Sequence, residues 1–430
     1  MPPMNARDTA LRALQTVLGG ETLDAAFALA EKASMSARDR AFQRLLVLTT
    51  LRRLGQIDDA LLRCVQRPQD LPPRERCVLR LGAAQLLFLG TPAFAAVDGA
   101  VEGTRSKSLK GLVNAVLRRL AREGADIVAS QDAARLNSPA WLWEQWSRDF
   151  GEPEARAIAA THQGEPPLDL TVSGDAAALA ERTGGMLLPT GSLRLPNAGK
   201  VADLEGYDAG AWWVQDAAAA LPARILLGAI GEPRRAKIAD LCAAPGGKTA
   251  QLATAGAAVT AVDRDAPRLQ RVADNLRRLR LEATLVAADA TQWSPNTQFD
   301  GVLLDAPCTA TGTIRRNPDI SWHKSAQSSA ALRPTQDALL DAAAAMLRPG
   351  GVLVYCVCSL DSGEGIERVE TFLQRRNGFR REPVRPAEVG GLAELITPAG
   401  DLRTLPSHLA ELGGLDGFFA ARLRFLPLQS

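Results

Sequence analysis

Two short segments place cysteines where a protein would use them for chemistry. DAPCTATG spans Asp305–Gly312 and YCVCSL spans Tyr355–Leu360, and each begins where an apolar run typical of a buried strand ends. A cysteine thiolate is a strong nucleophile, and a neighbouring thiol or carboxyl group can exchange protons with its substrate. Free cysteine is usually a small buried apolar residue, but a cysteine that follows proline beside a strand-end aspartate is less typical of a core. Cys308, Cys358 and Asp305 are therefore candidate catalytic residues.

A glycine-bearing turn, LCAAPGGKTA, follows another short apolar run, KIADL. The turn is similar to a phosphate-binding loop, but such a loop needs a glycine where this chain has Cys242, and Pro245 removes a backbone donor. A nucleoside triphosphatase is therefore disfavoured. A dinucleotide dehydrogenase is also disfavoured, because the chain has no G-x-G-x-x-G after its first strand in this region.

Acidic residues follow the next strand candidates. Asp263 ends AVTAVD, Asp289 follows ATLVAA and Asp305 follows GVLL. A carboxylate at the position of Asp263 can accept hydrogen bonds from both hydroxyl groups of a ribose. Turn and carboxylates together favour a nucleoside cofactor without phosphates, and S-adenosylmethionine fits that description.

The elements that position these residues form three parts. From about residue 213 to 430, strand candidates alternate with helical patterns, which predicts a doubly wound parallel sheet of the Rossmann-like α/β class. Residues 1–137 are predicted to be helical throughout, and 138–212 form a small mixed module with a helix at WLWEQW and a strand at LDLTV. The aromatic residues of this module, with Trp212 and Trp213, are interpreted as packing residues rather than base-stacking ones.

The composition of the 430 residues limits the class of protein. The 50 Lys+Arg and 48 Asp+Glu give a net charge of +2, so a nucleic-acid surface must be a local patch. No apolar run approaches a membrane span, and the start lacks a secretory signal, so we expect a cytoplasmic protein without membrane contact. Its six scattered cysteines predict reduced thiols rather than a disulfide framework.

One helical segment near the end of the first part has both a core face and a basic face. Leu109, Leu112, Val113, Val116, Leu117 and Leu120 form an apolar stripe at helical spacing. Between residues 102 and 123 six basic side chains face only two acidic ones, an excess of four positive charges. This face is a candidate for contacts with phosphate groups, although a solvated helix face explains the charges equally well.

With a methyl donor beside two thiols, one reaction accounts for the residues present. Carbon 5 of a pyrimidine is a poor nucleophile, and a thiolate that adds to carbon 6 activates it. Asp305 can stabilise the charge that develops on the ring, and a second acid/base group can help to release the product. By spacing alone, either Cys308 or Cys358 can be the nucleophile.

The loop CAAPGGKT and the segments DAPCTATG and YCVCS occur in an order that resembles the Sun/Fmu (RsmB) family of bacterial 16S rRNA cytosine-5 methyltransferases. RRNPDISW and the terminal GLDGFFAARL also resemble this family, and GLVNAVLRRL is similar to its NusB-like helical RNA-binding domain. The resemblance covers nearly the whole chain. It implies a NusB-like domain at 1–137, a small linking module at 138–212 and a Rossmann-like methyltransferase domain at 213–430.

The resemblance also implies a role for each matching residue. Cys358 matches the nucleophile, Cys308 the thiol that assists release, and Asp305 the acid between cofactor and base. Asp263 matches the acid that binds ribose and Asp289 the acid near adenine. The loop that holds S-adenosylmethionine is matched by Cys242, Ala243, Ala244, Pro245, Gly246, Gly247 and Lys248.

The chain departs from the family pattern beside the implied nucleophile. The family usually has threonine before it, whereas this chain reads Cys356-Val357-Cys358, so Cys356 is a possible spare thiol on the same strand face. The three histidines have no metal-ligand spacing, and no metal is expected. The expected protein is a monomer that acts on 16S rRNA, free or in an assembling subunit; the alternative is a noncatalytic RNA-binding or assembly factor.

Overall fold

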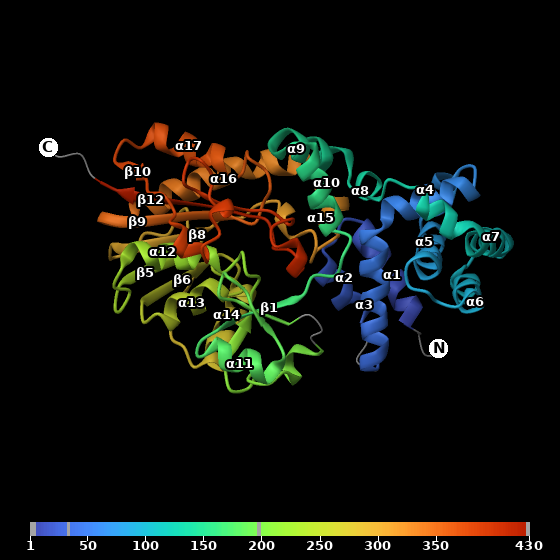
Figure 1. Ribbon diagram of the computed structural model, residues 1–430, viewed down its shortest axis with the longest axis horizontal. Helices are drawn as coiled ribbons and strands as arrows, with labels where there is room; N and C mark the ends of the chain where they lie inside the picture. Colours follow the sequence, from blue (N-terminus) through green and yellow to red (C-terminus); the bar gives the residue numbers. More distant parts are fainter. Residues whose placement is uncertain (1–5, 32–34, 196–198, 427–430) are drawn as a thin grey trace. The chain divides into compact units, whose positions relative to one another are not determined.

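The computed structural model describes residues 6–31, 35–195 and 199–426, and the chain folds into two compact units (Figure 1). The first unit contains the residues up to Glu165 and the segment Ile314–Ser325. The second contains Pro166–Thr313 and the residues from Ala326 onward. The segment 138–212 is thus divided between the two units, and the three-part division made from the sequence stays a prediction.

The first unit is helical. Its apolar stripes bury into one core, as the residues Val113, Val116, Leu117 and Leu120 of α7 show. Leu109 lies in the short 3-10 turn η2 before α7 and is only half-buried. The helices are α1 (Ala6–Leu18), α2 (Leu23–Ala30), α3 (Ala37–Arg52), α4 (Leu54–Cys64), α5 (Pro73–Leu87), α6 (Ala93–Gly103), α7 (Lys110–Ala129), α8 (Ala133–Leu136), α9 (Ala140–Phe150) and α10 (Glu152–Thr161), with 3-10 turns η1 (Pro68–Asp70) and η2 (Lys107–Leu109).

A segment from the second half of the chain belongs to this helical unit. It carries the short helix α15 (Ile320–His323) and includes most of RRNPDISW. The buried carboxylate of Asp319 accepts a hydrogen bond from the backbone N–H of Leu23 at 3.0 Å, at the start of α2. The indole of Trp322 donates to the carbonyl of Leu51 at 2.9 Å. These contacts explain why the segment leaves the sheet domain to which its sequence position assigned it.

The second unit begins with a small antiparallel sheet in the order β2-β3-β1-β4. Its core holds Trp212, and Trp213 is buried as well, which confirms the packing role predicted for this pair. The elements are β1 (Leu168–Val172), α11 (Ala176–Thr183), β2 (Met186–Leu187), β3 (Leu193–Leu195), the 3-10 turn η3 (Val201–Asp203) and β4 (Trp212–Val214).

A large sheet follows, in the order β10-β12-β9-β8-β5-β6-β7, with β11 paired to β12. Strands β5 to β9 run parallel, whereas β12 is antiparallel to β9. The strands are β5 (Lys237–Leu241), β6 (Ala258–Asp263), β7 (Thr284–Ala287), β8 (Phe299–Asp305), β9 (Leu347–Val357), β10 (Phe379–Arg381), β11 (Leu402–Thr404) and β12 (Phe418–Phe425).

Helices cover both faces of this sheet (Figure 1). Along β9, Leu353, Tyr355 and Val357 join the core under α16 and α17, while Val354 and Cys356 join the core under α12. The helices are α12 (Leu221–Ile230), α13 (Gly247–Thr254), α14 (Ala266–Leu279), α16 (Ala326–Ala345) and α17 (Ile366–Arg375), with 3-10 turns η4 (Thr311–Thr313), η5 (Pro386–Val389), η6 (Ala393–Leu395) and η7 (Ala410–Leu412).

The architecture confirms the predicted fold class: a helical domain precedes a small mixed sheet and a Rossmann-like α/β domain. Among the described residues, none of the helices combines the length and apolar character needed to cross a bilayer.

Candidate active site

The carboxyl ends of the parallel strands bring the predicted site residues to one edge of the large sheet. Strand β6 ends at Asp263 and β8 at Asp305, while β9 ends directly before Cys358. The ladder pairs Asp305 with Cys356. Pro307 has no backbone N–H, so β8 cannot extend along β9 beyond this point. Open α/β sheets bind their ligands at this edge.

The predicted cofactor loop connects β5 to α13. Cys242 adopts a left-handed conformation with φ of 60°, and Gly246 at φ of 99° precedes the first turn of α13. A Cβ on Gly246 would lie 2.9 Å from the side chain of Val272 on α14, so the loop needs a glycine here. Burial raises the pKa of the Cys242 thiol to about 12, which keeps this third cysteine at the site protonated.

A pocket of about 390 Å³ lies beside this loop and is lined by Cys242, Asp263, Asp289 and Pro307, among other residues. Asp263 is only 4% exposed, and its carboxylate accepts hydrogen bonds at 3.0 Å from the backbone N–H groups of Ala244 and of Asp265. Asp289 is exposed and accepts from the backbone N–H of Thr291 at 2.9 Å and from its hydroxyl at 2.7 Å.

The residues of this pocket fit S-adenosylmethionine. Its volume lies in the range typical of small-ligand sites. The two carboxylates can accept hydrogen bonds from hydroxyl and amine groups, and Ala290, Pro307 and Leu339 supply apolar surface for a base. A larger cavity of about 790 Å³ lies at the opposite ends of β5, β6 and β7, and none of the predicted site residues lines it.

Lys248 holds the candidate catalytic acid. Its Nζ lies 2.8 Å from Oδ2 of Asp305 and 5.2 Å from the ring centre of Phe418. Burial alone would lower the pKa of Lys248, but the nearby Asp305 carboxylate outweighs this effect and the pKa rises. Lys248 is therefore a charged partner of Asp305 in addition to being part of the cofactor loop, a contact that the sequence pattern did not reveal.

The two candidate thiols meet. Sγ of Cys308 lies 3.5 Å from Sγ of Cys358, although 50 residues separate them in sequence. Contact with the Cys358 thiol, followed by burial, raises the pKa of Cys308 well above its usual range. At this distance one thiol can give a proton to the other or to a group held between them.

A close backbone contact fixes the loop of Cys308 beside that of Cys358. The N–H of Gly312 donates to the carbonyl of Cys358 at 3.0 Å, and the N–H of Gly417 donates to the carbonyl of Gly312 at 2.7 Å. A Cβ on Gly312 would lie 1.9 Å from the carbonyl oxygen of Gly417. The glycine that ends DAPCTATG is therefore needed for this approach.

Cys356 differs from Cys358 in accessibility. It is fully buried, and its thiol donates to Oδ1 of Asp305 at 3.5 Å. Burial, reinforced by Asp305, raises its pKa well above the usual range. Cys356 does pack against the same core as Cys358, as the strand alternation predicted. Its burial argues against the hypothesis of a spare nucleophile and makes it a second partner of Asp305.

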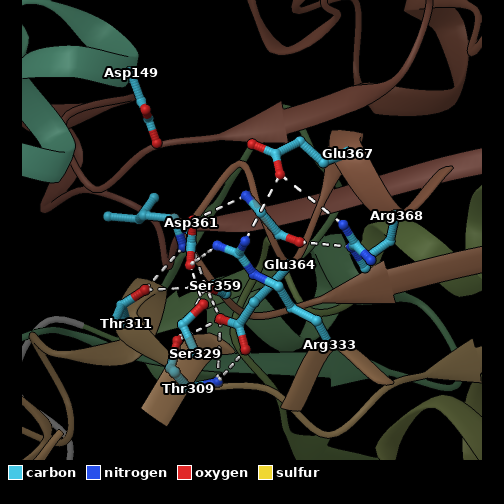
Figure 2. Close-up of polar contacts among 12 residues, drawn as sticks. Asp149, Thr309, Thr311, Ser329, Arg333, Ser359, Asp361, Glu364, Glu367 and Arg368 are labelled. Atoms are coloured by element: carbon cyan, nitrogen blue, oxygen red, sulfur yellow. Dashed lines mark hydrogen bonds and ion pairs between the residues drawn. The ribbon is translucent and has the colours of Figure 1, made fainter. Parts of the chain in front are cut away.

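A further acid at the site had no signal in the sequence. Glu364 lies six residues after Cys358 and is fully buried. Its carboxylate binds the side chains of Thr309 and Ser359, the residues that directly follow the two cysteines (Figure 2). Only the fold brings these three residues together.

The predicted basic face lies on α7 and the turn before it. Arg105, Lys107, Arg118, Arg119 and Arg122 are exposed. Arg119 pairs with Glu123 at 2.7 Å, and Arg122 lies 3.7 Å from the same carboxylate. The remaining cations of this face lie opposite the buried stripe of the helix, in the arrangement that phosphate contacts would need.

Comparisons with known proteins match both units. The sequence profile described as 16S rRNA methyltransferase RsmB/F matches residues 230–424, and that of the NusB family matches residues 4–122. The ribosomal RNA small subunit methyltransferase B of Vibrio cholerae is 37% identical over 90% of this chain and 93% of its own length. The protein of the same name from Pseudomonas putida is 37% identical over 98% of each chain.

A solved structure supports the fold over the same extent. The crystal structure of PH0851 superimposes with a TM-score of 0.72 at 22% identity, covering 97% of this chain and 98% of that one. The sequence relationship and the shared architecture therefore both extend from the helical unit through the Rossmann-like domain.

Proposed function

The chain belongs to the RsmB/F family of 16S rRNA methyltransferases, and we propose that it methylates carbon 5 of a cytosine in 16S rRNA through a covalent bond from Cys358 to carbon 6. It is an S-adenosylmethionine-dependent rRNA methyltransferase with a NusB-like amino-terminal domain. The identity of the modified atom and the covalent route are the parts that we propose.

In the proposed reaction the thiolate of Cys358 forms a bond to carbon 6 of the cytosine, and electron density moves to carbon 5. Asp305, held by Lys248 at 2.8 Å, faces the developing charge at nitrogen 3 and the exocyclic amine. S-adenosylmethionine supplies the methyl group to carbon 5. Removal of the carbon-5 proton then restores the double bond and expels the Cys358 thiolate, and we assign assistance in this release to Cys308.

The observation that carries this proposal is the 3.5 Å contact between the two thiols, beside an acid that is itself held by a lysine. A noncatalytic RNA-binding or assembly factor would need the basic face of α7. It would have no need for two thiols in contact at the edge of a cofactor pocket.

The cofactor roles follow the lining of the 390 Å³ pocket. We assign Asp263 to the ribose hydroxyl groups, Asp289 to the side of the adenine, and the loop from Cys242 to Lys248 to the remainder of S-adenosylmethionine. The same proposal assigns the basic face of α7 to RNA phosphates and takes the acting species to be a monomer in the cytoplasm.

Bisulfite mapping of ribosomal RNA tests this function. RNA from cells that lack the protein should lose one 5-methylcytosine from 16S rRNA, and the intact gene should restore it. The gene with Cys358→Ala should fail to do so. A lost methyl group on another atom, or on another RNA, would contradict the proposal.

A further inference from the structure

Glu364 is an acid buried among groups that all donate to it. It lies in the loop between β9 and α17 with no exposed surface. Among the described residues, its carboxylate accepts hydrogen bonds from the N–H of Thr309 at 3.0 Å, its hydroxyl at 2.5 Å, the hydroxyl of Ser359 at 2.6 Å and the side chain of Gln336 at 3.2 Å. Burying a carboxylate is costly unless such donors compensate it, so this arrangement requires an explanation.

The two hydroxyl donors tie Glu364 to both cysteine loops. Thr309 follows Cys308 directly, and Ser359 follows Cys358 directly. The two hydroxyl groups also lie 3.2 Å from each other, at the same carboxylate oxygen (Figure 2). One carboxylate thus sets the position of the residue after each thiol.

The thiols need such a link because they come from different strands. Cys308 is carried by the loop after β8, and Cys358 follows the end of β9. Holding their sulfur atoms 3.5 Å apart fixes two loops at once, which costs conformational entropy. Hydrogen bonds to a charged group in a buried site are strong enough to offset this cost.

We propose that Glu364 is a positioning residue for methyl transfer, which holds Cys308 and Cys358 at contact distance by binding Thr309 and Ser359. This inference rests on the proposed roles of the two thiols. Its negative charge also favours the protonated form of Cys308, whose pKa is raised mainly by the Cys358 thiol and by burial, with Glu364 contributing in the same direction. A protonated Cys308 does not compete with Cys358 as a nucleophile.

The loop keeps other anchors when Glu364 is replaced. Asp361 accepts hydrogen bonds from the hydroxyl of Ser329 and, at 2.9 Å, from the N–H of Gly363. Arg333 lies 3.5 Å from the same carboxylate (Figure 2). A variant at Glu364 should therefore fold while losing the link between the thiols.

The first test is steady-state kinetics of the full chain with S-adenosylmethionine and ribosomal RNA. Glu364→Ala should lower kcat about 100-fold, the order expected when reacting groups move by about 1 Å. The KM for S-adenosylmethionine should stay within about twofold, because Glu364 does not line the cofactor pocket. Glu370→Ala, at an exposed glutamate of α17, is the matched control and should behave like the parent.

Glu364→Gln separates positioning from mere packing. Its amide oxygen can accept from the Thr309 N–H and from Gln336, while its amide hydrogens donate to the two hydroxyl groups, which can rotate to accept. The glutamine variant should therefore recover kcat to within about tenfold of the parent. Equal kcat values for the parent and the alanine variant would overturn the proposal.

The second test measures the spacing of the thiols without catalysis. In buffers of reduced and oxidised glutathione, Cys308 and Cys358 of the parent should form a mutual disulfide, with release of two glutathione thiols, detected by peptide mass spectrometry. Glu364→Ala should need at least about tenfold more oxidised glutathione for the same extent of pairing. An unchanged pairing curve would refute the positioning role.

These readouts also separate this inference from the function on which it rests. If no cytosine is methylated but Glu364→Ala still weakens the pairing, the proposed reaction fails and the positioning role stands. If Glu364→Ala does not fold, Ser359→Ala removes one arm of the link and should give smaller changes of the same kind in both tests. Parent-like kcat and pairing in that variant would contradict the proposal.

Discussion

Replacing Asp240 by asparagine should change how the stability of the protein depends on pH. Asp240 lies in β5, directly before the cofactor loop, and is fully buried. Burial raises its pKa from 3.8 to about 7, despite a hydrogen bond from the Thr249 hydroxyl at 2.5 Å. Between these values the folded state keeps a proton that the unfolded state releases. The contribution of Asp240 to stability is therefore present below about pH 4 and is lost as the pH rises to about 7.

The size of the effect follows from the two pKa values. A difference of about three, at about 1.4 kcal/mol for each pKa unit, gives about 4 kcal/mol of unfolding free energy lost between pH 4 and pH 8. Asp240→Asn removes this titration. Its amide brings donors to the place of Oδ1, which has no hydrogen-bond partner in the described structure, at a cost of about 1–3 kcal/mol at every pH.

Urea denaturation of parent and variant from pH 4 to pH 8, followed by tryptophan fluorescence, measures this difference. The variant should be the less stable protein near pH 4 and should gain about 4 kcal/mol relative to the parent by pH 8. Asp208→Asn, at an exposed aspartate, is the control. A difference between Asp240→Asn and the parent that does not change with pH would refute the reasoning.

Three further variants test the site, the surface and the backbone. Asp263→Ala should weaken the binding of S-adenosylmethionine by about 1–3 kcal/mol in calorimetry, because charged hydrogen bonds are removed, and unchanged affinity in a folded variant would count against its role. Replacing Lys110 and Arg118 by glutamine should flatten the slope of log affinity for RNA against log salt by about one for each phosphate group that the variant no longer binds; an unchanged slope would identify a solvated face. Gly312→Ala should lower the unfolding free energy by about 1–3 kcal/mol and impair methyl transfer, because its Cβ meets backbone, whereas Gly111→Ala has open space and should be tolerated; equal urea midpoints for the two would contradict this account.

The sheet was predictable from sequence because each parallel strand is a short apolar run that ends in a distinctive residue. KIADL and FDGVLLD coincide with β5 and β8, and Asp263 ends β6 as expected. Predicting the common edge required only the rule that parallel strands align their carboxyl ends. Local patterning thus fixed the neighbourhood of the site.

Contacts between distant segments were not predictable in this way. Nothing in the spacing indicated that Asp319 binds the start of α2, that Lys248 holds Asp305, or that Glu364 binds the loops of both cysteines. Each contact joins residues that are far apart in sequence or hidden in an unremarkable run. Their geometry depends on how the elements pack, which periodicity does not describe.

The most direct measurement of the central claim is denaturing gel electrophoresis of Cys308→Ser and Cys358→Ser with ribosomal RNA and labelled S-adenosylmethionine. Cys308→Ser should attack and methylate the base but release it slowly, so a covalent adduct with labelled RNA should accumulate. Cys358→Ser should form no adduct, because a serine hydroxyl is a far weaker nucleophile at neutral pH, and Cys356→Ser should turn over nearly normally. An adduct with Cys358→Ser and none with Cys308→Ser would reverse the two roles, and full activity of both variants without any adduct would contradict covalent catalysis by these thiols.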